Sequence, residues 1–236
     1  KNPRVLKINE YLAPKFFYFK NIFFQSMPIS ISICGYALAA SIIFTYVGQS
    51  GEYAAAGYGA GTRIEQVVLL PILGINTALI SIISQNFGAK NFDRIKETYF
   101  TSIKYSFIIM ITAGTIVFTS ADYITSIFSD DPEVIEYGKR YLKISAFVLP
   151  AYPIFFLSNG FFMALKKSEN AMISNFFRNV LNPIAVFYIA KYISASFNTF
   201  FWIWVSINWF FSISYLLIII YYFKTKLEKS SAVVHP

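Results

Sequence analysis

Three ionisable side chains lie deep inside apolar stretches of this 236-residue chain: Arg63, Glu65 and Arg178. A charge within hydrocarbon is costly unless it faces protein or water, and such residues commonly mark the path of an ion or a substrate. We therefore expect these residues to take part in binding or transport. The structural alternative is that Arg63 reaches outward to the surface and that Glu65 or Arg178 only ties helices together.

Polar residues accompany these charges on one face of each of four apolar stretches. When the sequence is placed on a helix at about 100° per residue, Glu65 and Asn76 share one direction, and a longer polar stripe containing Arg63 lies beside it. Four helices with such faces would together surround a hydrated cavity. The candidate residues of this pathway, besides the three charges, are Gln25, Tyr36, Gln66, Asn76, Thr77, Asn159, Asn175 and Asn182.

Residue patterns typical of enzymes are missing. The sequence has no HExxH, GxSxG or GxxxxGK[ST] motif, and its only histidine and only cysteine are His235 and Cys34. We expect no metal site, no disulfide and no cofactor. The sequence favours a carrier that draws its energy from an ion gradient or a partner, and an enzyme is the weaker alternative.

The composition predicts an all-α, polytopic membrane protein. Hydrophobic residues make up 56% of the chain and charged residues only 14%, against about 25% charged residues in an ordinary soluble domain. Strands are not expected, because an open sheet cannot satisfy its backbone in lipid. The net charge of +8 sits in short tracts between apolar runs, so we expect the lipid bilayer, and not nucleic acid, as the partner.

Six segments are long and apolar enough to span a bilayer core of about 30 Å. Most basic residues fall on one side if the spans alternate, and the opposite loops are acidic, so the positive-inside rule predicts that both chain ends are cytoplasmic. The spans lie within a transmembrane lobe at 16–226, with a preceding segment at 1–15 and a tail at 227–236. The expected spans are 16–47, 53–87, 97–120, 133–164, 170–193 and 199–223.

Three stretches of the second span resemble the multidrug and toxic compound extrusion (MATE) transporters. They read AAAGYGAGTRIEQ at 54–66, LPILGINTA at 70–78 and SQNFGA at 84–89, and are similar to the second helix of that family's C-terminal lobe. The stretch IFSDDPEV at 127–134 is similar to the lobe's long outer loop. The resemblance covers essentially the whole chain.

The resemblance implies the C-terminal six-helix lobe, spans seven to twelve, of a two-lobed antiporter in the plasma (inner) membrane. Residues 1–15 would be the cytoplasmic linker from an N-terminal six-helix lobe that is absent here. Family members export small organic, often cationic, compounds in exchange for Na⁺ or H⁺ through alternating access of the two lobes, without a cofactor.

One departure from the family affects the ion site. A branch of the family has an acidic residue about eight positions after a proline in the seventh span, where counting from Pro28 reaches Tyr36. The tenth span of that branch also carries an acid, and none occurs between Ile144 and Leu165. The alternatives are that the missing N-terminal lobe binds the coupling ion or that Glu65 contributes.

Two other functions remain open from the sequence. A flippase for lipid-linked oligosaccharides, from the same superfamily, would have more basic charge inside its cavity, and Arg63 and Arg178 leave that reading open. A remote alternative is an intramembrane enzyme or an assembly subunit.

Overall fold

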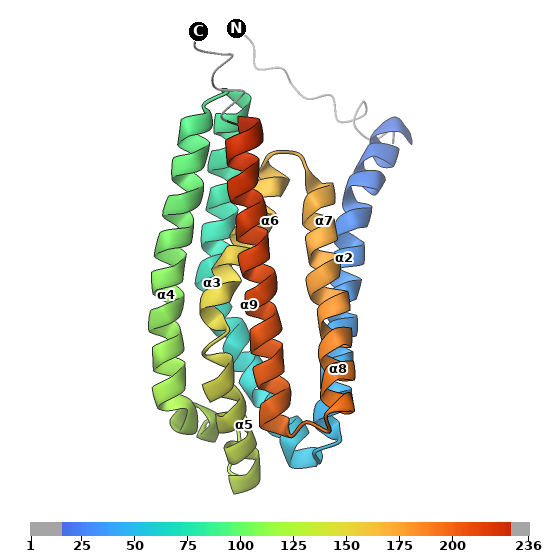
Figure 1. Ribbon diagram of the computed structural model, residues 1–236, viewed down its shortest axis with the longest axis vertical. Coiled ribbons are helices and arrows are strands. Elements are labelled where there is room, and N and C mark those ends of the chain that lie inside the picture. Colours follow the sequence, from blue (N-terminus) through green and yellow to red (C-terminus); the bar gives the residue numbers. More distant parts are fainter. Residues whose placement is uncertain (1–15, 228–236) are drawn as a thin grey trace, which may run out of the picture.

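The structure is a computed structural model that describes the backbone of residues 16–227, so the segment 1–15 and the tail after Leu227 lie outside the described residues. Every element in this range is a helix, and the fold is all-α (Figure 1). The elements are α2 (Phe16–Gly48), α3 (Glu52–Gly88), α4 (Phe92–Ser126), α5 (Pro132–Ser145), the 3₁₀ turn η1 (Leu149–Ala151), α6 (Tyr152–Ala164), α7 (Ser168–Phe176), the π turn η2 (Phe177–Leu181), α8 (Asn182–Tyr192), α9 (Phe197–Tyr222) and the π turn η3 (Phe223–Leu227).

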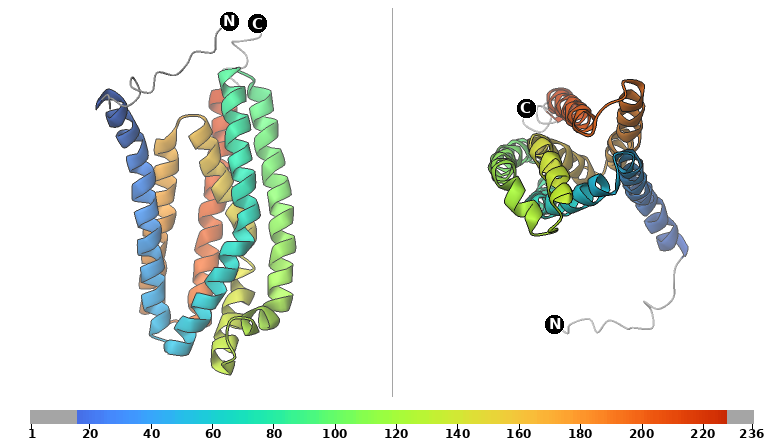
Figure 2. Two further views of the ribbon diagram at one scale, coloured as in Figure 1. Left: turned by 180° about the vertical axis from the view of Figure 1, so that it is seen from behind. Right: turned by 90° about the horizontal axis from the view of Figure 1, so that it is seen from below.

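The helices run along one long axis and form two groups (Figure 1). In one group, α3 packs against α4, α5 and α6. In the other, α2 packs against α7, η2 and α8. Helix α9 contacts α6 from the first group and α8 from the second. The two groups diverge at the end where α2 begins and α9 ends (Figure 2).

Two of the expected spans are broken helices, because prolines lie within them. A proline has no backbone N–H and clashes with the preceding turn, so it interrupts a regular helix. Pro150 lies in η1 and Pro153 opens α6, and the α5–α6 pair is bent by 41° at this point. Pro183 follows the π turn that separates α7 from α8. Helix α3 continues through Pro71 but leans in its first half and stands parallel to α4 in its second half (Figure 2).

Local sequence signals fix the helix ends. The Asp131 side chain caps α5 by accepting a hydrogen bond from the backbone N–H of Glu133 at 2.8 Å, and Pro132 occupies the first helical position. Helices α3, α6 and α8 are followed by Lys90, Lys166 and Ser194 with φ of 58°, 57° and 51°. These left-handed residues end the helices in Schellman-type turns, with bonds such as Asn91 N–H to the Asn86 carbonyl at 2.9 Å.

Hydropathy and length mark a multi-pass membrane protein. Among the described residues, three segments are long and apolar enough to cross a membrane, namely Glu52–Gly88, Phe92–Ser126 and Phe197–Thr225, and the bent α5–α6 pair makes a fourth. The segment Cys34–Gly48 is a shorter apolar helix. Helix α3 has 37 residues and at 1.5 Å per residue reaches about 55 Å, so it must tilt or project beyond a bilayer.

Glycines allow the close approach of α3 and α5. A Cβ atom on Gly57 would lie 2.7 Å from both the Gly138 nitrogen and the Val134 carbonyl oxygen. One turn later, a Cβ on Gly61 would overlap the ring of Tyr141. These contacts lie in the larger of two buried apolar clusters, which occupies the end of the bundle near α5, and a second cluster fills the opposite end. Small residues are the usual means of bringing helices together in lipid.

We expect Gly57→Ala to destabilise the protein by about 1–3 kcal/mol. The added methyl group would overlap backbone atoms of α5, which cannot rotate away as a side chain can. The matched control is Gly59→Ala on the same helix, where an added Cβ meets nothing within 4 Å. Thermal unfolding of the purified protein in detergent compares the two variants. Equal midpoints for both variants would contradict the close-packing role of Gly57.

Candidate functional site

A cavity of about 450 Å³ lies between the two groups of helices. Its lining comes from α2, α3, α5, α6, α7, η2 and α9, so helices of both groups contribute. Glu65 and Arg178 both line it, together with the aromatic side chains Tyr36, Tyr152 and Trp204. The cavity therefore combines one acid, one base and several aromatic rings within an otherwise apolar bundle.

The carboxylate of Glu65 is held by two tyrosines from the bent span. The hydroxyl of Tyr141 on α5 donates to one carboxylate oxygen, and the hydroxyl of Tyr152 at the start of α6 donates to the other. Gly61 stands one turn before Glu65, and its missing side chain leaves the space that the Tyr141 ring occupies. Charge-assisted bonds of this kind offset the cost of removing a carboxylate from water.

Arg178 lies in the π turn η2 and is enclosed by aromatic rings. Its guanidinium carbon is 4.1 Å from the ring centroid of Phe155, 4.9 Å from that of Tyr152 and 5.6 Å from that of Phe156. Its Nε donates to the Asn208 side-chain oxygen at 3.3 Å. Cation–π contacts strengthen when the cation is desolvated. Tyr152 therefore contacts both charges, the acid through its hydroxyl and the base through its ring.

None of the described ion pairs joins Glu65 to Arg178. Each charge is instead satisfied by neutral groups, so neither one neutralises the other directly. Both remain able to interact with a charged species that enters the cavity. A π turn within an α-helix is itself common at functional sites, and here it places the only base among the cavity-lining residues.

A second polar network ties three helices together beside the cavity. The Asn159 amide on α6 donates to the Asn175 oxygen on α7 at 3.3 Å. Its own oxygen accepts from the Tyr215 hydroxyl on α9 at 3.2 Å. Asn175 lines the cavity, whereas Asn159 is buried behind it. Asn159 thus positions Asn175, and both of its amide functions are used within the protein.

The candidate residues divide into three groups by location. Glu65, Arg178, Tyr36, Gln66 and Asn175 line the cavity, and Tyr36 is 59% exposed there. The other described candidates lie on the outside of the helices or in the interior behind the cavity.

Arg63 and Thr77 lie on the outside of the lobe. Arg63 is exposed and lines a separate pocket of about 420 Å³ with Phe44 of α2 and Ser129 of the loop between α4 and α5. Thr77 is exposed, and its hydroxyl donates to the Leu73 carbonyl of its own helix at 3.0 Å. The stripe that contains Arg63 therefore does not face the cavity along its whole length.

Asn76 and Asn182 are placed in the interior, away from the cavity lining. The side-chain oxygen of Asn76 packs against Gly160 and has no hydrogen-bond partner. Asn182 is fully buried at the start of α8, and neither its amide nitrogen nor its oxygen has a partner. The side chain of Gln25 lies outside the described residues.

Tyr141, Tyr152 and Asn208 belong to the site, although they are not among the candidate pathway residues given by the sequence. Tyr152 had a sequence signal, because it stands seven residues before Asn159 and so shares its helical face. Asn208 is an amide side chain in the middle of the strongly apolar α9. Tyr141 had no comparable signal, because its contact with Glu65 depends on how α3 and α5 pack.

Comparison with known families and proteins gives consistent matches. The MatE family model matches residues 28–189. The chain is 26% identical over 156 residues to the FAD transporter of Shewanella oneidensis, covering 66% of this chain and 34% of that protein. It is also 26% identical over 174 residues to the multidrug export protein MepA of Staphylococcus aureus, covering 73% of this chain and 38% of that protein. The chain thus spans little more than a third of these relatives.

Solved structures show the same fold. A transporter of the MOP superfamily from Pyrococcus furiosus superposes with a TM-score of 0.82 at 19% identity, covering 94% of this chain and 49% of that one. A MATE structure in the bent conformation superposes with a TM-score of 0.80 at 21% identity, again with 94% and 49% coverage. The described helices therefore have the fold of half of these molecules.

A double-mutant cycle tests the Glu65–Tyr152 contact. We expect Tyr152→Phe to destabilise the protein by about 1.5–3 kcal/mol, because a hydrogen bond to a charged group is lost. Its effect should shrink when Glu65→Gln is already present, giving a coupling energy above about 0.5 kcal/mol. Reversible unfolding in mixed micelles gives these values. Tyr36→Phe, on an exposed tyrosine of the same cavity, serves as the control, and strictly additive effects of the pair would contradict the contact.

Proposed function

Because the chain belongs to the MatE family, we propose that it forms one six-helix lobe of a secondary active transporter. This transporter exports small organic, often cationic, compounds in exchange for Na⁺ or H⁺. It needs no cofactor, and it works together with an N-terminal six-helix lobe. Named relatives are a multidrug export protein and an FAD transporter, so the class of organic substrate varies among related proteins.

The single observation that carries the proposal is the carboxylate of Glu65 in an aromatic-lined cavity. A carboxylate held by two hydroxyls can accept a proton or attract a cation. Rings such as Tyr36 and Trp204 offer faces to a flat or cationic organic molecule. The cavity volume of about 450 Å³ falls within the range of about 300–1,000 Å³ that is typical of small-molecule sites.

The broken helices support a moving, two-lobed carrier. Irregular backbone at membrane depth is tolerated where it is buried in protein or lines a cavity. In secondary transporters, discontinuous helices commonly form the substrate and ion sites at the interface of two repeats. Here η2 and the start of α6 supply Arg178 and Tyr152 to the cavity. Alternating access would then come from rocking of the two lobes about this shared site.

The distribution of basic residues favours the antiporter over the flippase. A flippase that accepts a lipid-linked phosphate would gather basic residues within its cavity. Arg63 instead lines the separate outer pocket, and Arg178 is the single base among the described cavity-lining residues, balanced by Glu65. The charge balance of the cavity suits a cation and its exchange for Na⁺ or H⁺ better than an anionic lipid headgroup.

We further propose a multi-pass position in the plasma (inner) membrane with both ends of this segment in the cytoplasm. The basic residues Lys90, Lys166 and Lys167 would lie on the cytoplasmic side, and the acidic loop that contains Asp130 and Asp131 on the outer side. This arrangement follows the positive-inside rule.

We expect Glu65→Gln, in the full-length transporter, to lower drug resistance several-fold without loss of membrane insertion, because the amide cannot take up a proton or carry the charge. The measurement is ethidium or fluoroquinolone accumulation in an efflux-deficient strain, with the sodium concentration and the pH varied. The wild-type protein should lower accumulation in a sodium- or pH-dependent way.

Glu52→Gln is the matched control, because it makes the same chemical change at the exposed start of α3. Immunoblotting of membranes is used to compare the two variants at equal expression. Resistance that is unchanged in Glu65→Gln at equal expression would contradict a transport role for this carboxylate.

Cysteine labelling tests the orientation. In a Cys34→Ser background, Ser129→Cys in the outer loop should react in intact cells with a membrane-impermeant maleimide. Ser168→Cys, at the start of α7, should react only after the cells are opened. The reverse pattern would place the two chain ends outside the cell and contradict the proposed orientation.

A further inference from the structure

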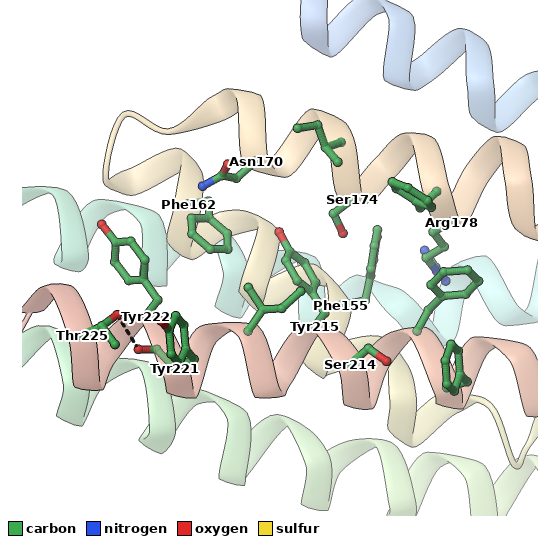
Figure 3. Close-up of a pocket in the computed structure, with 15 residues that line it drawn as sticks. Phe155, Phe162, Asn170, Ser174, Arg178, Ser214, Tyr215, Tyr221, Tyr222 and Thr225 are labelled. Atoms are coloured by element: carbon green, nitrogen blue, oxygen red, sulfur yellow. Dashed lines mark hydrogen bonds between the residues drawn. The ribbon is translucent and has the colours of Figure 1, made fainter.

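A second cavity, also of about 450 Å³, lies between α6, α7 with η2, and α9. Figure 3 shows it as a cleft with α7 on one side and α9 on the other. It shares only Phe155 and Arg178 with the central cavity. These two side chains form a common wall, and the remainder of the cleft is a separate site. Neither the transport proposal nor the pathway residues discussed above account for it.

This cleft has a polar end, a mostly apolar wall and a single charged side chain at its far end. Asn170, Tyr221, Tyr222 and Thr225 lie at one end, and Arg178 lies at the other (Figure 3). The wall between them is mostly apolar, and Ser174, Ser214 and Tyr215 are its polar members. Its side chains include Ile173, Phe177, Phe210 and Ile218, which are 51%, 44%, 67% and 55% exposed.

The cleft has the depth of one bilayer leaflet. The lining residues of α9 and η3 run from Phe210 to Thr225, which is about 22 Å along a helix. Half of a bilayer that is about 40–45 Å thick with its headgroups is about 20–22 Å. A mostly apolar cleft of this depth, with several polar residues at the end nearest the proposed cytoplasmic surface, can hold a lipid acyl chain below its headgroup.

The polar mouth of the cleft is basic. Lys166 and Lys167 lie in the turn before α7, and Lys224 lies next to the lining residues of α9; all three are exposed. The Lys167 Nζ is 4.7 Å from the ring centroid of Tyr222, which lines the mouth. Glu169 is the acidic residue in the same turn, so the mouth keeps a net positive charge that complements an anionic headgroup.

We propose that this cleft binds one anionic phospholipid of the cytoplasmic leaflet. The phosphate lies among Lys167, Lys224 and the Asn170 amide. One acyl chain runs between α7 and α9 toward the wall formed by Phe155 and Arg178. The proposal rests on the cytoplasmic orientation proposed above, but not on the transported compound or the coupling ion. A bound acyl chain would pack against the aromatic rings around Arg178 on the side opposite the central cavity.

Native mass spectrometry of the full-length protein, released from nanodiscs that contain phosphatidylglycerol and phosphatidylcholine, tests the proposal. We expect one phosphatidylglycerol to be retained in preference to phosphatidylcholine. The double variant Lys167→Gln with Lys224→Gln should weaken its retention by about tenfold or more. Lys20→Gln with Lys104→Gln is the matched control, because it removes the same charge at exposed positions that do not line the cleft.

A second pair of variants tests the position of the acyl chain. Ser214→Phe places a ring inside the cleft and should abolish retention, whereas Ser206→Phe, eight residues earlier on α9 and outside the cleft, should retain the lipid. Addition of inorganic phosphate should not displace the lipid, because the apolar chain contributes to binding.

Four results would overturn the proposal. They are equal retention in the lysine variant and its control, equal retention of phosphatidylcholine, full displacement by inorganic phosphate, and no retained lipid in the wild-type protein. The last result would indicate that another part of the protein fills the cleft. Since retention is measured without transport, failure of this proposal and failure of the transport proposal can be told apart.

Discussion

The burial of one carboxylate within an apolar helical bundle constrains the rest of this structure. Glu65 cannot stay charged in such surroundings without hydrogen-bond donors, and both of its donors are tyrosines of one bent span. Tyr141 reaches it because Gly61 leaves room on α3. Tyr152 reaches it because the helix restarts after the prolyl turn η1. The glycine and the bend therefore have a common consequence, which is a carboxylate that is hydrogen-bonded through both oxygens and faces the cavity.

The same principle explains the location of the base. Arg178 lies where α7 passes into the π turn η2, and three aromatic rings and Asn208 take the place of water around it. Because the acid and the base do not neutralise each other through a direct ion pair, the cavity keeps two separate charges. Two separately satisfied charges can each respond to an incoming ion, whereas a closed ion pair would first have to be broken.

The sequence was sufficient for the helical class, the membrane environment and the ionisable residues of the site, because these follow from composition and from the cost of charge in lipid. It was not sufficient for the partners of those residues. Periodicity placed Glu65 and Asn76 on one face of α3, yet Glu65 lines the cavity and Asn76 packs against Gly160. The bend at Pro150 and the π turn before Pro183 change the directions in which the following side chains point. A regular helix at about 100° per residue cannot predict these changes.

The wall shared by the two cavities links the environment of the bilayer to the site. Phe155 stacks on the Arg178 guanidinium at 4.1 Å and contributes to both cavities. Tyr215 lines the cleft between α7 and α9, and its hydroxyl donates to the Asn159 oxygen. The Asn159 amide in turn donates to Asn175 of the central cavity. The cleft and the central cavity are therefore connected by two sets of contacts, one through the stacked rings and one through the amide network. Helices α7 and α9 form the sides of this cleft, and α9 contacts both groups of the bundle, so the cleft lies where the two groups meet.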